Sequence, residues 1–237
     1  MHGLLRHFDV SILSFLNRYS RHSHAFDCLV TILASNQLTK GGIIVAFYWW
    51  VWFRRSNKSR DHEFLVFGLM ASLVAIAVAR GLSLLGPFRE RPLRDPALHF
   101  VMPFGMSSEV LIHWSSFPSD HAAVFLALSY AIYLVARGPG LLALGYAFFA
   151  ICLPRIYIGV HYPTDILAGI LIGVGLASLA KIDRLRTTLT RPALNYLETS
   201  HESFHALLFL LTFQLAVTFD PIRTIARGLL EMMAYRP

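Results

Sequence analysis

The chain carries its most informative residues at positions 115–165, which read SSFPSDHAAVFLALSYAIYLVARGPGLLALGYAFFAICLPRIYIGVHYPTD. This stretch contains two apolar segments, each close to the length that crosses a lipid bilayer as a helix. A polar cluster lies at either end, and the two clusters comprise Ser119, Asp120, His121, Arg155, His161 and Asp165. Because two successive crossings return a chain to the side it left, both clusters are predicted to meet at one membrane surface.

The composition indicates an integral membrane protein. Hydrophobic residues make up 55% of the 237 positions, and charged residues make up only 15%. A helix needs about 20 apolar residues to cross a bilayer. Six segments are predicted to do so, at 41–53, 63–86, 121–136, 141–157, 164–180 and 203–219. These spans leave no room for a second folded domain, so residues 1–237 are predicted to form one all-α membrane bundle.

The regions outside these spans carry weaker patterns. Apolar residues at helical spacing predict an N-terminal amphipathic or short membrane helix, and they are Phe8, Ile12, Phe15, Leu16 and Tyr19. The pattern leaves open whether residues 24–36 cross the membrane, re-enter it or continue that helix. Five prolines at 87–118 exclude one continuous helix and predict an interfacial loop over the polar clusters. Gly169, Gly173 and Gly175 are predicted to give their helix a slim face for close packing.

The net charge of +7 does not indicate a nucleic-acid-binding protein, because the basic residues are scattered between apolar blocks. The loops opposite the polar clusters hold nine of them: Arg54, Arg55, Lys58, Arg60, Arg137, Lys181, Arg184, Arg186 and Arg191. The side of the clusters, apart from Arg89, Arg91 and Arg155, holds five: Lys40, Arg94, Arg223, Arg227 and Arg236. Cytoplasmic loops are enriched in Lys and Arg. The clusters are therefore predicted to face the periplasm or cell exterior from a cytoplasmic (inner) membrane.

The first cluster is typical of an anion site at a helix N-terminus. Ser119 is a favourable N-cap residue, and the helix is predicted to begin at Asp120 and His121. The first N–H groups of a helix lack intrahelical partners and lie at the positive end of its dipole, so they bind phosphate readily. His121 is predicted to stand beside an anion held there.

The second cluster repeats this arrangement. Pro163 suits the first helical position, and Asp165 follows two residues later. A carboxylate there can accept the ring N–H of His161, fix its tautomer and leave the other nitrogen ready to attack. Three arginines add forked donors that suit phosphate oxygens, namely Arg89, Arg91 and Arg155.

A metal centre is the alternative for His161 and Asp165 taken alone. A hard or borderline cation would sit badly among three arginines, so no metal is predicted. His201 and His205 lie at the i, i+4 spacing that can bind zinc, but no further ligand is near them in the sequence. An interfacial position is predicted for both.

Three motifs follow one another along the chain: Arg91-Pro92, then Pro118-Ser119-Asp120-His121, then Arg155-x5-His161-x3-Asp165. In this order they resemble the type 2 phosphatidic acid phosphatase superfamily, which also contains the vanadium haloperoxidases. That family carries Lys-x6-Arg-Pro, Pro-Ser-Gly-His and Ser-Arg-x5-His-x3-Asp. The resemblance extends over residues 63–180, which form the predicted catalytic core.

The resemblance implies a membrane lipid phosphatase that needs no metal or cofactor. His161 would take the phosphoryl group, Asp165 would orient it, and His121 would protonate the leaving oxygen and later activate water. The phosphate oxygens would be held by Arg91, Ser119 and Arg155. Arginines and helix termini would neutralise the charge of the transition state.

The chain departs from the family pattern at three places. Leu84 stands where the family lysine is expected, and Arg89 is predicted to take that role, with Arg80 as the alternative. Arg80 lies inside a span, where an arginine either snorkels outward or meets an anion. Asp120 replaces the motif glycine and would repel phosphate unless it turns to an arginine or to the loop. Pro154 replaces the serine of the third motif.

The predicted substrate is a lipid whose tail stays in the bilayer while its phosphate reaches the arginines. An undecaprenyl or other polyprenyl pyrophosphate is the first choice, and phosphatidic acid or phosphatidylglycerophosphate is the next. A phosphotransferase that uses an acceptor other than water would need the same residues. A transporter is disfavoured because the polar residues cluster at the ends of spans rather than near mid-membrane.

Overall fold

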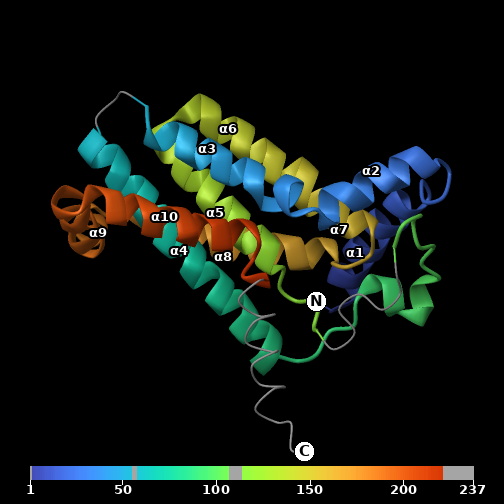
Figure 1. The fold of residues 1–237 in the computed structure, drawn as a ribbon. Helices are drawn as coiled ribbons and strands as arrows, with labels where there is room; N and C mark the ends of the chain where they lie inside the picture. Colours follow the sequence, from blue (N-terminus) through green and yellow to red (C-terminus); the bar gives the residue numbers. More distant parts are fainter. Residues whose placement is uncertain (1, 55–57, 107–113, 221–237) are drawn as a thin grey trace, which may run out of the picture.

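The computed structural model describes residues 2–54, 58–106 and 114–220, and every regular element in these ranges is helical (Figure 1). The α-helices are α1 (His2–Asn17), α2 (His24–Ser35), α3 (Ile43–Trp52), α4 (Lys58–Leu85), α5 (Asp120–Val135), α6 (Arg137–Tyr146), α7 (Leu153–Tyr157), α8 (Pro163–Ser178), α9 (Asp183–Thr199) and α10 (His201–Ala216). Shorter 3₁₀ or π-helical segments are η1 (Leu38–Gly42), η2 (Pro92–Arg94), η3 (Pro96–Leu98), η4 (Ala147–Cys152) and η5 (Leu179–Lys181). The prediction of an all-α membrane bundle is confirmed.

Fewer helices than the six predicted have the full length of a membrane crossing. In the described part of the chain, three are long and apolar enough: Ser59–Leu85, Arg137–Tyr157 and Pro163–Lys181. A fourth crossing results if α2 and the helix from η1 to α3, which are bent by 63° relative to each other, form one span. The 16-residue helices α5 and α10 rise about 24 Å, which is less than the roughly 30 Å of a hydrocarbon core.

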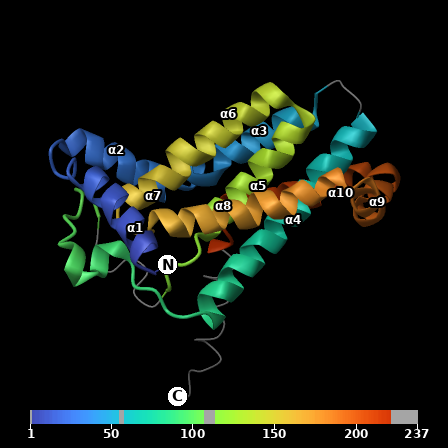
Figure 2. The ribbon, with the colours of Figure 1, turned by 180° about the vertical axis from the view of Figure 1, so that it is seen from behind.

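The N-terminal segments pack where the bundle carries its polar clusters. As predicted, α1 is amphipathic: it buries Asp9 and Leu13 and exposes Leu4 and Phe15. It contacts α7 and α8, the two helices that carry Arg155 and Asp165 of the third motif (Figures 1 and 2). Residues 24–36, whose course the sequence left open, form α2 and the turn into η1. Of the predicted interfacial loop, positions 107–113 lie outside the described residues.

Helix α5 forms the centre of the bundle. In both views it lies between α3 and α6 on one side and α4 and α8 on the other (Figures 1 and 2), and it contacts all four. Ten of its 16 residues are buried, as expected for a helix that is apolar all round. The polar residues at its N-terminus are therefore held by a helix that is packed on every side.

Two glycines of α8 allow that helix to touch α5 backbone to backbone. A Cβ at Gly169 would meet the carbonyl oxygen of Ser119, and a Cβ at Gly173 would overlap that of Ala123. Small residues four apart give a helix a groove for such an approach. Gly175 was predicted to share this face but has nothing within 4 Å of its added Cβ, because it lies on another side of α8.

Replacing Gly173 with Ala is expected to destabilise the protein by about 1–3 kcal/mol, because α5 and α8 must separate to admit the methyl group. Gly175→Ala is the matched control on the same helix. It is expected to leave stability unchanged or raise it by up to about 1 kcal/mol, because alanine is the better helix former. Thermal unfolding in detergent measures both variants, and equal midpoints would contradict the close contact.

Candidate active site

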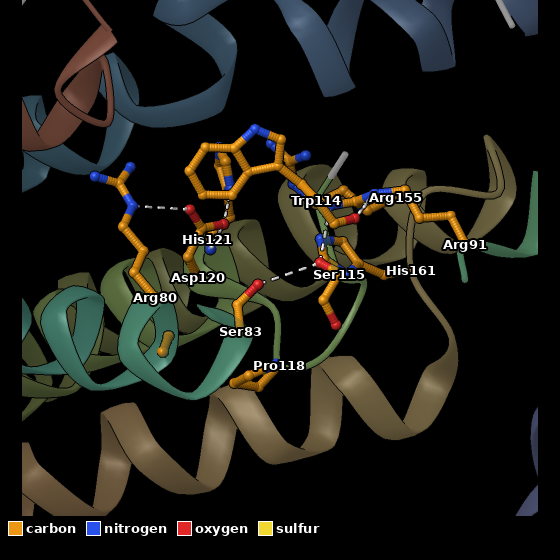
Figure 3. A pocket seen from close by; sticks show the side chains of 11 residues that line it. Arg80, Ser83, Arg91, Trp114, Ser115, Pro118, Asp120, His121, Arg155 and His161 are labelled. Atoms are coloured by element: carbon orange, nitrogen blue, oxygen red, sulfur yellow. Dashed lines mark hydrogen bonds and ion pairs between the residues drawn. The ribbon is translucent and has the colours of Figure 1, made fainter. Parts of the chain in front are cut away.

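One pocket brings together side chains from distant parts of the chain (Figure 3). Its walls come from α4, the loop before α5, the start of α5, α7 and the turn after α7. The lining residues are Ala79, Arg80, Ser83, Arg91, Trp114, Ser115, Pro118, Asp120, His121, Arg155 and His161. Both histidines of the predicted site therefore face the same space, with three arginines.

His161 is held in a defined orientation at the pocket wall. Its side chain is 95% buried, and Nδ1 lies 2.7 Å from the carbonyl oxygen of Ser116. That geometry assigns the ring proton to Nδ1, which donates to the carbonyl, and leaves Nε2 with its lone pair. Burial lowers the pKa of His161 below its ordinary value, and the charges of Arg91 and Arg155 act in the same direction. The imidazole is therefore neutral at neutral pH.

Asp165 was expected to accept the ring proton of His161, but its nearer oxygen is 3.7 Å from Nδ1, beyond a hydrogen bond. The carboxylate is fully buried and caps α8 instead, where Oδ2 accepts the backbone N–H of Tyr162 at 2.7 Å. The carbonyl oxygen of Asp165 accepts the backbone N–H of Ser119 at 3.1 Å. Asp165 thus supports His161 electrostatically and joins the start of α8 to the start of α5.

Arg89 does not lie where it was predicted to act. Its guanidinium points away from the pocket and donates to Asp165 at 2.5 Å, to Asp9 at 2.6 Å and to Thr164 at 2.9 Å. It also stacks on the Tyr162 ring, 4.1 Å from the centroid. With its terminal nitrogens engaged by these groups, Arg89 does not line the pocket, where it was predicted to replace the family lysine.

Asp9 is a site residue that the sequence analysis missed. It comes from α1, is 1% exposed, and accepts from the backbone and side chain of Thr164 as well as from Arg89. The available signal was a lone carboxylate on the apolar face of a predicted amphipathic helix. A buried carboxylate there requires a cationic or hydrogen-bonding partner.

Arg91 lines the pocket and also holds its rim together. Its guanidinium donates to the carbonyl oxygens of Val160 at 2.5 Å, Ser115 at 3.2 Å and Trp114 at 3.2 Å. Burial lowers the pKa of Arg91 to about 10, so the side chain remains a cation at neutral pH. It joins the loop before α5 to the turn that carries His161.

Arg155 is a buried cation on the pocket wall. It is 6% exposed, and one terminal nitrogen donates to the carbonyl oxygen of Ala34 at 3.4 Å. Its Nε is buried without a hydrogen-bond partner among the described residues. Buried polar groups are normally paired, so a guanidinium with unused donors on a pocket wall is suited to an anion.

Ser119 begins α5 as predicted but does not line the pocket. Its hydroxyl accepts the backbone N–H of Ala122 at 3.4 Å, and the residue is fully buried. The side chain serves as the N-cap, which was one of the two roles expected of it. The predicted contact of Ser119 with phosphate therefore has no counterpart among the lining residues of the pocket.

Asp120 turns away from the centre of the pocket, toward a histidine and an arginine. Its Oδ1 lies 2.6 Å from Nδ1 of His121, and its Oδ2 lies 3.6 Å from Nε of Arg80. Arg80 also donates to the carbonyl oxygen of Thr218 at 2.9 Å, and Nε2 of His121 lies 3.3 Å from the Thr218 hydroxyl. Arg80 therefore faces the pocket rather than snorkelling, and Thr218, which follows α10, is a neighbour that no sequence motif indicated.

The fold and this pocket define an all-helical membrane protein in which two histidines share one pocket with three arginines. Residues 89–188 match the model of the PAP2 superfamily. The matched residues contain all three motifs, which confirms the resemblance over this part of the chain and supports a membrane lipid phosphatase.

Several relatives share parts of the sequence. Bacitracin transport permease protein BcrC of Bacillus licheniformis is 47% identical over 60 residues, which cover 25% of this chain and 29% of that protein. Undecaprenyl-diphosphatase BcrC of Bacillus subtilis (strain 168) is 25% identical over 70% of this chain and 79% of its own length. Lipid A 1-diphosphate synthase of Escherichia coli (strain K12) is 29% identical over 78% of this chain and 82% of its own length.

A solved structure shares the fold. The crystal structure of a transmembrane PAP2 type phosphatidylglycerolphosphate phosphatase from Bacillus subtilis superposes with a TM-score of 0.50. The two proteins are 21% identical, and the match covers 77% of this chain and 87% of the other. The arrangement of helices described above therefore occurs in an integral membrane protein.

Replacing Arg89 with Lys is expected to lower kcat about tenfold and to change KM less than about twofold, as for supporting residues around an active centre. A lysine ammonium keeps the charge but loses the planar fork that reaches Asp9 and Asp165 together. Steady-state kinetics on a lipid phosphate measure this split. Arg91→Lys, at the pocket wall, is the comparison and should raise KM. A raised KM with unchanged kcat for Arg89→Lys would instead show that Arg89 binds the substrate.

Proposed function

We propose that this protein hydrolyses a polyprenyl diphosphate, with undecaprenyl diphosphate as the first choice, through a phosphohistidine intermediate on His161. The observation that carries the proposal is the meeting of His161 and His121 in one pocket lined by arginines. One membrane domain, residues 1–237, would act with residues 63–180 as its catalytic core. The excess of basic residues in the opposite loops supports a site at the outer face of the cytoplasmic membrane.

The first step transfers the phosphoryl group to the enzyme. Nε2 of His161 attacks the terminal phosphorus with its lone pair, and the bond from phosphorus to the bridging oxygen breaks. His121 gives the proton on Nε2 to the departing oxygen. Arg91 and Arg155 hold the equatorial oxygens, where negative charge is spread in the transition state.

The second step releases phosphate. His121, now neutral, takes a proton from water, and the water oxygen attacks the phosphorus. The bond to Nε2 of His161 breaks, its electrons return to the ring nitrogen, and inorganic phosphate leaves. The lipid phosphate product leaves with its tail in the bilayer.

The position of Arg80 favours a diphosphate over a monoester. In Figure 3, Arg80 and His161 lie at opposite sides of the pocket, with His121 and Asp120 between them. A leaving group protonated by His121 therefore lies near Arg80, on the side of the pocket opposite His161. A monoester leaves as a neutral alcohol, whereas a diphosphate leaves as a charged lipid phosphate that an arginine stabilises.

The relatives support this choice of substrate. One is named an undecaprenyl-diphosphatase and another a lipid A 1-diphosphate synthase, and both names refer to a lipid that carries a diphosphate. The second name also supports an alternative function. A protein that makes a lipid diphosphate must pass a phosphoryl group to a lipid acceptor, so a phosphotransferase using the same phosphohistidine is the second candidate. Phosphatidic acid or phosphatidylglycerophosphate is the alternative substrate.

His161→Ala is expected to lower phosphate release from a panel of lipid phosphates more than about a thousandfold, because the nucleophile is lost. The assay uses purified protein in detergent without added metal ions. His201→Ala, at the start of α10 and outside this pocket, is the control and should keep full activity. Full activity of His161→Ala, or an absolute need for a divalent ion, would contradict the mechanism. Product analysis with and without a lipid acceptor separates hydrolysis from transfer.

Arg80→Gln is expected to lower kcat/KM for polyprenyl diphosphate about 10- to 100-fold relative to polyprenyl monophosphate. This range corresponds to the loss of one hydrogen bond to a charged group. A general loss of activity would lower both kcat/KM values equally, so it does not change their ratio. If both substrates lose activity equally, Arg80 does not recognise the second phosphate.

A further inference from the structure

The residue that most distinguishes this pocket is Asp120, which stands where the motif has glycine. Its carboxylate is engaged locally: Oδ1 lies 2.6 Å from Nδ1 of His121 and accepts the backbone N–H of His121 at 2.8 Å (Figure 3). Two contacts to one oxygen fix the carboxylate against the ring. The short distance requires a proton on Nδ1, which leaves Nε2 as the nitrogen that exchanges protons.

The two histidines thus have partners of different charge. His161 donates from Nδ1 to a neutral carbonyl, that of Ser116, at 2.7 Å. His121 donates from Nδ1 to a carboxylate. A neutral acceptor suits a nucleophile, which must keep its lone pair, whereas a carboxylate favours the imidazolium that a general acid must become.

Burial and two cations near His121 oppose its protonation. These cations are Arg155 on α7 and Lys40 in η1, which also pairs with Asp220 at 3.8 Å, whereas Arg80 on α4 faces Asp120. A phosphate bound to the arginines cancels much of this repulsion, because its negative charge lies among the same cations. Occupancy of the pocket and the charge of His121 are therefore coupled.

The second ring nitrogen also has a defined direction. Nε2 of His121 lies 3.3 Å from the hydroxyl of Thr218, whose φ of +54° is rare for a β-branched residue. Such a strained backbone persists only where the surroundings enforce it, and it occurs often at functional sites. Asp120 on one nitrogen and Thr218 on the other leave the ring a single orientation.

We propose that Asp120 is a positioning residue for the general acid: it holds Nδ1–H of His121 and allows Nε2 to take up one proton from solvent when a phosphate fills the pocket. That proton is the one later given to the leaving oxygen. The inference rests on the proposed function, since it assigns His121 the acid role. It adds a residue that the family motif does not contain.

The test compares Asp120→Asn, which keeps the shape and removes the charge, with Asp183→Asn. Asp183 occupies the first turn of α9 and pairs with Arg186 at 2.8 Å, so it matches Asp120 as a helix-start carboxylate beside an arginine. Asp120→Asn is expected to lower kcat on the lipid diphosphate about 10- to 100-fold with KM within about threefold. Asp183→Asn should retain the activity of the unmodified protein.

A second readout distinguishes positioning from a merely structural role. The basic limb of the kcat–pH profile should move to lower pH in Asp120→Asn, because the imidazolium loses a neighbouring negative charge. Calorimetric titration with inorganic phosphate, in buffers of different ionisation enthalpy, counts protons taken up on binding. The unmodified protein should take up more protons than Asp120→Asn at the same pH, and Asp120→Glu, which keeps the charge, should lie nearer the unmodified protein.

The outcomes separate this inference from the proposed function. An unchanged pH profile and unchanged proton uptake in Asp120→Asn would overturn the role of Asp120 even if His161→Ala is inactive. Retained activity of His161→Ala would instead overturn the proposed function itself. If Asp120→Asn does not fold, as judged by thermal unfolding in detergent, Asp120→Glu is tested in its place. A normal kcat in Asp120→Glu together with altered proton uptake would also overturn the inference.

Discussion

The structure depends on two helix N-termini that lie side by side, those of α5 and α8. The backbone N–H of Ser119 donates to the carbonyl oxygen of Asp165, and the glycines at 169 and 173 let the two helices approach closely. Adjacent N-termini bring together two positive dipole ends, which repel one another. Carboxylates in the first turns, Asp120 and Asp165, offset that repulsion. What remains is a positive environment that favours an anion.

The pocket cations are held by the protein before any substrate arrives. Arg91 donates hydrogen bonds to three loop carbonyls, and Arg155 donates one to the carbonyl oxygen of Ala34. Charged groups fixed in this way need little reorganisation when negative charge develops, which is the main source of electrostatic stabilisation in phosphoryl transfer. Fixed contacts also distinguish the two histidines, because His161 contacts a neutral carbonyl and His121 contacts a carboxylate.

Local patterns were predictable from the sequence, and long-range contacts were not. Membrane crossings placed His121 and His161 at one surface, and the N-cap role of Ser119 followed from its neighbours in the chain. Arg89 was misplaced because the direction of a loop side chain depends on partners such as Asp9, which lies 80 positions away. Three helices of the described residues, or four with the bent pair, have full spanning length rather than six, because hydropathy detects apolar blocks whereas bends and helix ends depend on packing.

The chain of contacts from Asp9 through Arg89 to Asp165 joins the first helix to the centre of the site. Both carboxylates are almost fully buried, so loss of Arg89 leaves two negative charges away from water without their shared cation. Removal of the arginine alone is therefore expected to be costly. In a set of homologous sequences Asp9 and Arg89 should therefore covary beside the motif carboxylate Asp165.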